Sequence, residues 1–205
     1  VMTHFADAPR DRVVEATYSV PFLSHAAMEP MNATAQFKDG KLTVWSPNQG
    51  PTPTRYICAS LTGLDQDDVT VHTTMMGGAF GRRGEVDFSA YAALIAMQSD
   101  GKPVKVTWTR EEDMTHDLYR PASSAKFMAV LGTDGLPIAL DGAIAAPSIM
   151  RSLMRRNFPS LGEGPLGPDK ALTDGGFNQP YDIANMSVRG IEVDMKVRTS
   201  FWRSV

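Results

Sequence analysis

Two tight turns constrain the fold of this chain most, because each lies between segments in which apolar and polar side chains alternate. Apolar and polar side chains alternate in residues 33–37 and 41–46, on either side of Asp39-Gly40. The same pattern returns in residues 124–148 around Thr133-Asp134-Gly135. A short Asp-Gly turn between two such segments is typical of a β-hairpin, in which the strands pair antiparallel. The chain must therefore contain antiparallel sheet, which argues against a doubly wound parallel fold.

Further strands and helices are predicted from the hydrophobic periodicity. Strands are expected at residues 13–23, 67–74, 104–110 and 187–197. Helices are expected at residues 51–61 and 86–98, with a helical turn at 110–114 and a short basic helix at 148–158. The helix at residues 51–61 has prolines in its first turn and Gly63 just after its last turn, and both are typical of helix ends. Antiparallel strands combined with two main helices predict an α+β fold with mixed or antiparallel sheets.

Composition and charge exclude several classes of protein. The net charge of −3 and the pI near 5.8 argue against a general nucleic-acid binder. No apolar run reaches the ~20 residues of a membrane span. The single cysteine, Cys58, excludes an internal disulfide framework and a cysteine-rich zinc site. Because the sequence opens on Val1 and closes on the bulky stretch FWRSV, we expect a piece of a longer chain.

A glycine-rich stretch, MMGGAFGRRGE at residues 75–85, joins a predicted strand to a predicted helix. Glycines let backbone N–H groups approach a ligand closely, and the first turn of a helix has unpaired N–H groups that suit phosphate. Arg82 and Arg83 can add charge-assisted hydrogen bonds. The alternative is a glycine-rich turn with two solvated arginines. The stretch does not match a dinucleotide-binding fingerprint, because Ala79 stands where that pattern requires its second glycine. It does not match a P-loop either, because Arg82-Arg83-Gly84 stands where that motif requires Gly-Lys-Ser/Thr.

Three stretches together resemble one family. HAAMEPMN, MGGAFGRR and TSFWRSV, in this order and with TREEDM and PYDI between them, resemble the molybdenum-cofactor-binding subunit of the xanthine dehydrogenase/aldehyde oxidase family. The branch is the bacterial isoquinoline 1-oxidoreductase β-subunit type, also known as the membrane-associated aldehyde dehydrogenase large subunit. The resemblance covers residues 14–205, nearly the whole chain.

The resemblance implies a role for the glycine-rich loop, residues 77–84. In such proteins this loop lies against the pterin cofactor and its phosphate. The implied cofactor-binding residues are Gly77, Gly78, Ala79, Phe80, Gly81 and Arg82. The branch has a third glycine where this chain has Ala79, and a methyl group is tolerated there only if the φ angle is negative.

Two further residues acquire roles from the resemblance. Gln49 in VWSPNQG matches a glutamine near an oxo ligand of molybdenum, where a neutral amide can donate a hydrogen bond. Arg203 in FWRSV matches an arginine that polarises or anchors the substrate. The alternatives are a surface glutamine and a salt-bridged arginine. The family's catalytic glutamate lies far toward the C-terminus of a longer subunit, so no catalytic residue is assigned here. Some relatives also have a substrate-contacting glutamate directly after the loop; its position holds Gly84 here, and the role is not carried over to Glu85.

His25 and Glu29 have the i, i+4 spacing of a metal-binding or acid–base pair on a helix. Pro30 and the short run argue against a regular helix there. The resemblance makes this segment a structural approach to the cofactor, and it implies no metal ligand from the protein.

The intact protein implied by the resemblance is a molybdenum-dependent oxidoreductase. It hydroxylates an isoquinoline-like N-heterocycle or an aldehyde with water as the oxygen source. The cofactor is molybdenum–molybdopterin, with the cytosine dinucleotide form favoured in this branch. Iron–sulfur clusters reside on a small partner subunit, and a cytochrome subunit is a further candidate partner. A periplasmic or membrane-associated location follows from the same resemblance.

Within this scheme we expect three consecutive segments. Residues 14–148 form the first cofactor-binding lobe, residues 149–185 a basic segment and Pro/Gly loop, and residues 186–205 a strand leading to the pocket segment FWRSV. The chain alone is expected to be folded, cofactor-free and inactive. The competing hypothesis is a non-catalytic α+β module that binds a phosphate-bearing ligand through the same loop.

Overall fold

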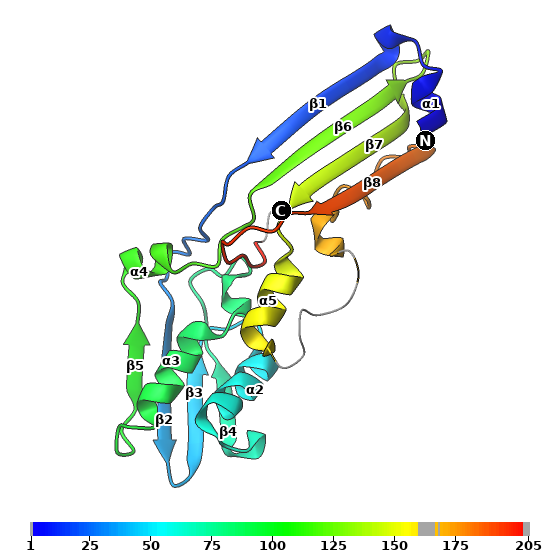
Figure 1. Ribbon diagram of the computed structural model, residues 1–205. Coiled ribbons are helices and arrows are strands. Elements are labelled where there is room, and N and C mark those ends of the chain that lie inside the picture. Colours follow the sequence, from blue (N-terminus) through cyan, green and yellow to red (C-terminus); the bar gives the residue numbers. More distant parts are fainter. Residues whose placement is uncertain (1, 160–166, 168, 203–205) are drawn as a thin grey trace. The chain divides into compact units, whose positions relative to one another are not determined.

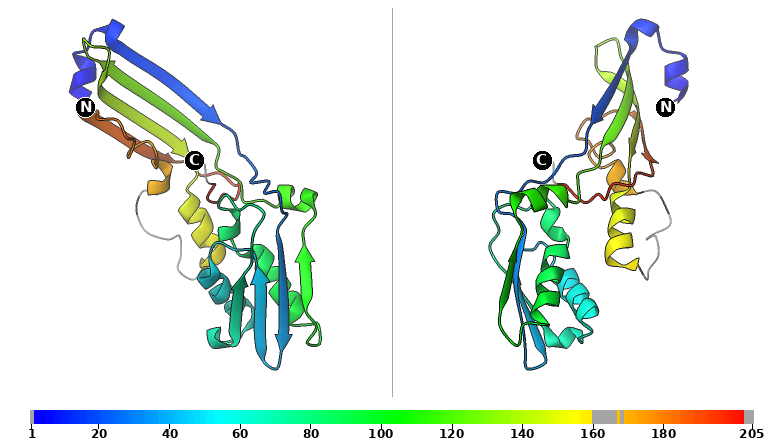
Figure 2. Two further views of the ribbon diagram at one scale, coloured as in Figure 1. Left: turned by 180° about the vertical axis from the view of Figure 1, so that it is seen from behind. Right: turned by 60° about the vertical axis from the view of Figure 1, so that its left-hand side comes forward.

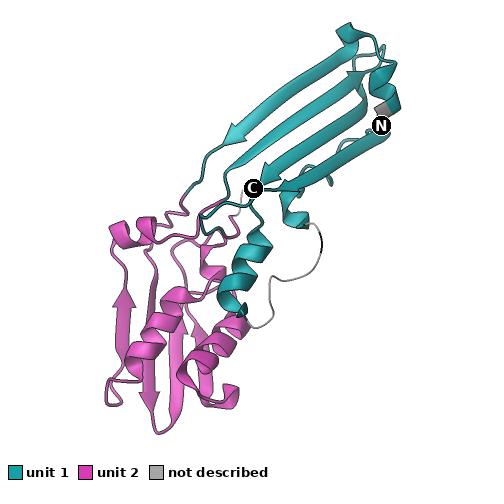
Figure 3. Cartoon of the chain, in the orientation of Figure 1, with its two compact units in different colours: residues 1–23, 121–199 teal, residues 24–120, 200–205 magenta. Residues whose placement is uncertain are grey.

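The computed structural model describes residues 2–159, 167 and 169–202. The chain forms two units, each assembled from segments distant in sequence (Figure 3). Unit 1 comprises Val1–Leu23 and Pro121–Thr199, and unit 2 comprises Ser24–Arg120 and Ser200–Val205. The three consecutive segments expected from the sequence do not coincide with this division, because the first strand of the chain pairs with a strand that begins at Ser123.

Unit 1 is built on a four-stranded sheet with the strand order β1-β6-β7-β8 (Figure 1). Its strands are β1 (Val13–Val20), β6 (Ser123–Leu131), β7 (Pro137–Ala146) and β8 (Asn185–Glu192). Its helices are α1 (Met2–Ala6) and α5 (Ile149–Asn157), with 3-10 turns at Arg10–Arg12 and Lys170–Leu172. The β1–β6 and β6–β7 pairs are antiparallel, whereas β8 runs parallel to β7.

Unit 2 has a second four-stranded sheet with the order β4-β3-β2-β5. Its strands are β2 (Asn32–Lys38), β3 (Lys41–Ser46), β4 (Val69–Thr73) and β5 (Val104–Thr107). Its helices are α2 (Pro51–Thr62), α3 (Asp87–Ala96) and α4 (Arg110–Thr115), with 3-10 turns at Gln66–Asp68 and Arg82–Gly84. Helices α2 and α3 cover one face of this sheet (Figure 2).

The two sheets share one plan. In each, an antiparallel hairpin (β2–β3 or β6–β7) is followed by a helix (α2 or α5) and then by a strand parallel to the second hairpin strand. A parallel neighbour requires such a crossover, since a tight turn can only reverse the chain. The fourth strand, β5 or β1, pairs antiparallel with the first hairpin strand.

The hydrophobic core of unit 2 fills the layer between its sheet and helices. Alternate residues of β2 and β3, such as Ala35 and Leu42, are fully buried beneath α3. Small residues such as Ala92 on α3 let the helix approach the sheet closely. Cys58 of α2 lies in the same core, where burial raises the pKa of its thiol to about 12. This cysteine is therefore an inert core residue.

The predicted α+β class with mixed sheets is confirmed, as are the two hairpins and the two main helices. Helix α2 ends at Gly63, whose φ of 73° is the left-handed C-cap expected of glycine. The predicted basic helix is α5, and the predicted turn at residues 110–114 is α4. The Pro/Gly loop predicted at residues 159–170 lies mostly outside the described residues.

The last predicted strand, residues 187–197, is wrong at its C-terminal end. Strand β8 ends at Glu192, whose partner across the sheet is Ala146, the last residue of β7. Beyond Ala146 the chain turns at Pro147 into α5, so the alternating residues after Val193 have no strand to pair with. Among the described residues, no helix is both long and apolar enough to cross a membrane.

Candidate functional site

The glycine-rich loop between β4 and α3 has an unusual backbone. Gly78 and Gly81 both have a φ of 101°, and Phe80 between them has a φ of 54°. Ala79 is not among the residues with positive φ, so a methyl group is tolerated at this position, where relatives in the branch have a glycine. A bulky residue in the left-handed region is strained by roughly 1–2 kcal/mol, and such strain is concentrated at functional sites. The Phe80 ring is nonetheless half-exposed.

Four consecutive N–H groups of this loop are available to a ligand. Among the residues that the structure describes, none accepts a hydrogen bond from the N–H groups of Gly78, Ala79, Phe80 or Gly81. Runs of main-chain N–H groups in turns with left-handed residues are a recurring kind of anion site. The described residues therefore leave these four main-chain donors, here called the cradle, to an outside acceptor such as phosphate.

Arg82 does not extend toward this cradle. Its side chain is fully buried, and its two terminal nitrogens donate to the two carboxylate oxygens of Asp87 at 2.9 and 2.7 Å. Its Nε lies 2.9 Å from Oδ1 of Asp117, and its guanidinium lies over the Trp108 ring at 5.5 Å. Burial would lower the pKa of Arg82, but the carboxylates of Asp87 and Asp117 outweigh burial and raise it.

Arg83 is also fully buried and holds the loop from the inside. It donates from Nε to the carbonyl of Gly78 at 2.8 Å and from Nη2 to the carbonyl of Glu29 at 2.8 Å. A weaker bond of 3.4 Å reaches the carbonyl of Pro47. Burial lowers the pKa of Arg83.

The alternative of two solvated arginines is therefore wrong, because both side chains are fully buried. Both guanidinium groups bind protein acceptors in this structure, and the cofactor-binding role of Arg82 stays a prediction. The physical reason is that a buried guanidinium must be neutralised and hydrogen-bonded. Their role in this structure is to shape the loop, and the donors that remain for an anion are backbone N–H groups.

Glu29 secures the beginning of the loop. Its carboxylate accepts the N–H of Gly77 at 2.7 Å and the amide of Asn32 at 2.8 Å, and it lies 3.1 Å from Nη2 of Arg83. Burial would raise the pKa of Glu29, but these donors lower it below its ordinary value. A side chain on Gly77 would meet Cβ of Glu29 at 2.7 Å, so glycine is required there by close approach.

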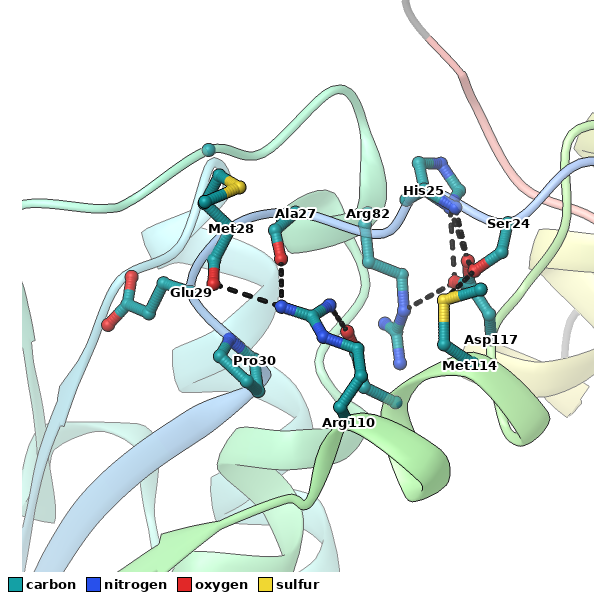
Figure 4. A network of polar contacts seen from close by, with 12 residues as sticks. Ser24, His25, Ala27, Met28, Glu29, Pro30, Arg82, Arg110, Met114 and Asp117 are labelled. Carbon is teal, nitrogen blue, oxygen red and sulfur yellow. Dashed lines mark hydrogen bonds and ion pairs between the residues drawn. The ribbon is translucent and has the colours of Figure 1, made fainter.

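His25 and Glu29 do not form a pair. The segment between them is not helical, and Figure 4 shows His25 beside Asp117 while Glu29 points elsewhere. No group of three or more His, Cys, Asp or Glu side chains among the described residues could hold a metal ion. The i, i+4 spacing in the sequence has no chemical meaning here because the segment does not form a helix.

The remaining candidates lie on either side of the loop. Gln49 is exposed, and its backbone N–H donates to the carbonyl of Arg83 at 2.8 Å, which keeps it next to the glycine-rich loop. Glu85 is buried and accepts a hydrogen bond of 2.6 Å from the hydroxyl of Ser200. Arg203 lies outside the described residues. The roles of Gln49 and Arg203 stay predictions.

Sequence reasoning missed Asp117 completely. This carboxylate accepts hydrogen bonds from Ser24, His25 and Leu118, and it is the counter-ion of Arg82. Burial alone would raise its pKa, but the hydrogen bonds from His25 and Ser24 outweigh burial and lower the pKa to about 2. An aspartate 92 positions after His25 has no local signal that would have identified it.

The left-handed backbone at Phe80 predicts an unusual order of variant stabilities. Replacing Phe80 with glycine removes the strain, whereas replacing it with alanine keeps the strain and also loses the ring. We expect the glycine variant to be more stable than the alanine variant by about 1 kcal/mol in urea unfolding. At the neighbouring Ala79, whose φ is not positive, glycine should be the less stable residue. If glycine were more stable than alanine at both positions 79 and 80, or less stable at both, the φ angles of the loop would be contradicted.

Comparison with known proteins shows the family of this chain. The model of the family described as the molybdopterin cofactor-binding domain matches residues 1–196. The beta chain of isoquinoline 1-oxidoreductase from Brevundimonas diminuta is 36% identical over 135 residues, which are 65% of this chain and 17% of that protein. A nicotinate dehydrogenase component from Pseudomonas putida is 29% identical over 195 residues, 92% of this chain and 16% of that protein.

Solved structures give the same result. Aldehyde oxidoreductase from Desulfovibrio gigas superposes with a TM-score of 0.63 and 26% identity, covering 71% of this chain and 16% of that chain. The chain thus spans about a sixth of the length of these three proteins. Because the family model covers nearly all of its residues, this chain belongs to the molybdopterin cofactor-binding domain family, as found in the molybdenum-binding subunits of xanthine dehydrogenase relatives.

Proposed function

We propose that this chain contributes part of the cofactor site of a molybdenum hydroxylase large subunit, and that its glycine-rich loop binds the phosphate of molybdopterin. One observation carries the proposal: the run of N–H groups from Gly78 to Gly81 has no acceptor among the described residues. Phosphate oxygens are strong acceptors, and a run of main-chain donors suits them. The strained Phe80 within this run supports a functional loop, since strain without a function is rarely kept.

In this proposal the bound cofactor supplies the redox chemistry of molybdenum, and the protein binds and orients it. The loop N–H groups hold the phosphate, while the buried Arg82 and Arg83 keep the loop in shape. Gln49, exposed beside the loop, donates its amide N–H toward the cofactor. Arg203 anchors or polarises the substrate.

The activity of the whole protein is part of the same proposal. We propose oxidation of an N-heterocycle or an aldehyde, with water as the oxygen source. Support comes from relatives whose names refer to isoquinoline, nicotinate and aldehydes. The matched proteins include single components of multi-subunit enzymes, which supports a partner; we propose an iron–sulfur small subunit, with a cytochrome subunit as a further candidate. The cytosine dinucleotide form of the cofactor and a periplasmic or membrane-associated location complete the proposal.

The test compares metal and pterin content in two preparations. The full-length subunit, produced with its neighbouring subunit, is expected to contain about one molybdenum per chain, measured by mass spectrometry, and to release a cytosine nucleotide on hydrolysis. The 205-residue chain alone is expected to contain neither. Absence of molybdenum from both would contradict the proposal. Inorganic phosphate would then be the probe for the competing hypothesis, a non-catalytic phosphate-binding module.

A further inference from the structure

The four-stranded sheet of unit 1 has one side that is apolar. Residues that lie opposite each other on neighbouring strands point to the same side of a sheet. On one side, rows across all four strands hold only apolar, tyrosine and glycine residues: Val14, Ala129, Leu140 and Met186; Ala16, Phe127, Gly142 and Val188; Tyr18, Ala125, Ile144 and Gly190. We call this side the apolar face. The other side carries two ion pairs, between Glu15 and Lys126 and between Asp141 and Arg189.

Only half of the apolar face is covered by described residues of unit 1. The connection between β7 and β8 lies against the β7–β8 half, where a Cβ on Gly190 would be 3.1 Å from the Cβ of Leu172. The β1–β6 half is open to solvent, and Val14, Tyr18 and Val20 on β1 are 51%, 61% and 41% exposed. Several large apolar side chains exposed side by side mark an interaction surface. We call this β1–β6 half the open half.

Unit 2 has the same plan and carries a helix at the corresponding place. Strand β6 corresponds to β2, the first strand of the hairpin, and β1 corresponds to β5, its antiparallel neighbour. In unit 2, helix α3 lies on β2 and β5 and shares that face with the crossover helix α2 (Figure 2). Beneath α3, Ala33 and Ala35 of β2 are at most 1% exposed. The half of the sheet that α3 covers in unit 2 is thus the open half in unit 1.

The helix that would complete unit 1 is absent from the part of the chain that the structure describes. In unit 2, α3 follows β4 along the chain, and the counterpart of β4 in unit 1 is β8. Among the described residues, no helix follows β8. The chain spans about a sixth of the length of three proteins that it matches, so a subunit of their length has ample further chain to supply a helix.

We propose that the open half is the docking site of an amphipathic helix from the same subunit, outside residues 1–205. The helix packs across β1 and β6 as α3 packs across β5 and β2. Helix α3 turns Phe88, Ala92 and Ala96, each four positions from the next, into the core of unit 2. The docking helix has a similar stripe of small apolar residues, because such residues allow close approach to a sheet. This interaction does not depend on cofactor binding by the glycine-rich loop.

The first test measures whether the open half is covered in the full-length subunit with its partner subunit. Tyr18→Cys places a thiol on the apolar face, and the matched control Ser19→Cys places one on the opposite side, at an exposed position of the same strand. A maleimide is added to the native protein, and mass spectrometry of the peptide with the new cysteine follows the reaction. We expect Tyr18→Cys to react about tenfold more slowly than Ser19→Cys, because a packed helix excludes the reagent. In urea the two variants should react at equal rates.

The second test identifies what covers the open half. A benzophenone amino acid replaces Tyr18, and the peptide that it captures on irradiation is sequenced by mass spectrometry. We expect a peptide outside residues 1–205 of the same polypeptide, with small apolar residues three or four positions apart, and a product with the mass of one subunit on a denaturing gel. A crosslink to the partner subunit or to a second copy would overturn the proposal, as would equal labelling of the two cysteines in the native protein.

Discussion

Replacing Gly81 with alanine is expected to disrupt the glycine-rich loop more than any other single methyl group added to it. The new Cβ would lie 2.1 Å from the oxygen and 2.7 Å from the carbon of the Phe201 carbonyl, and backbone atoms cannot rotate away as a side chain can. The φ of 101° at Gly81 adds left-handed strain. Together these effects should lower the free energy of unfolding by about 2 to 4 kcal/mol, measured by urea unfolding of the chain.

The same substitution should displace the segment Ser200–Trp202 from the loop, because Phe201 lies against Gly81. In the full-length subunit we expect molybdenum content to fall about tenfold or more, since displaced loop N–H groups no longer converge on a phosphate. Gly84→Ala is the matched control: it lies in the same loop, its φ is not left-handed, and nothing lies within 4 Å of its added Cβ. That variant should retain wild-type stability and molybdenum. Similar losses at both glycines would mean that the Phe201 contact is not the cause.

The fold was largely predictable because its signals are local. A turn such as Asp39-Gly40 and a helix stop such as Gly63 each depend on a few neighbouring residues. The two-unit division was not predictable in this way. It follows from β1 pairing with β6, more than a hundred residues later, and periodicity alone does not choose a partner strand.

The candidate site was predictable only in its backbone. Glycines at the mouth of a helix indicated unpaired N–H groups, and the N–H groups of Gly78 to Gly81 have no acceptor among the described residues. Their binding of a cofactor stays a prediction. The burial of Arg82 and Arg83 was not predicted, because charge in a sequence carries no information about burial. Their partners Asp87, Asp117 and Glu29 range from five to fifty-four positions away, and only the folded chain brings them together.

The buried charges also hold the glycine-rich loop in one shape. Arg82 is neutralised by Asp87 and Asp117, and Arg83 by Glu29, so each guanidinium is fixed at several points. Fixing a donor array in advance lowers the entropy lost on binding. The N–H groups of the loop are thus preorganised by residues that themselves need not touch the ligand.

Replacing Asp117 with asparagine is expected to give the largest loss of stability in unit 2. The substitution keeps the size of the side chain but leaves His25 and Arg82 buried beside a neutral amide. Removing one partner of a buried ionic network costs about 3 to 5 kcal/mol. Arg82 keeps its pair with Asp87, so the loss arises because Nε of Arg82 and the ring of His25 no longer face an ionised carboxylate. Urea unfolding at pH 7 measures this loss. Asp67→Asn is the control, since the Asp67–Arg55 pair is exposed, and it should leave the midpoint unchanged.

The pH dependence of the unfolding free energy distinguishes the contribution of the Asp117 charge from that of its side-chain packing. Its pKa is about 2 in the folded chain, below the ordinary value of 3.8, so its ionisation stabilises the fold above pH 4. That contribution, about 2 kcal/mol, is lost as the pH falls from about 5 toward 2. The difference in unfolding free energy between wild type and Asp117→Asn should therefore shrink by this amount over that range. A difference that stays constant with pH would show that packing of the side chain, rather than its charge, stabilises the site.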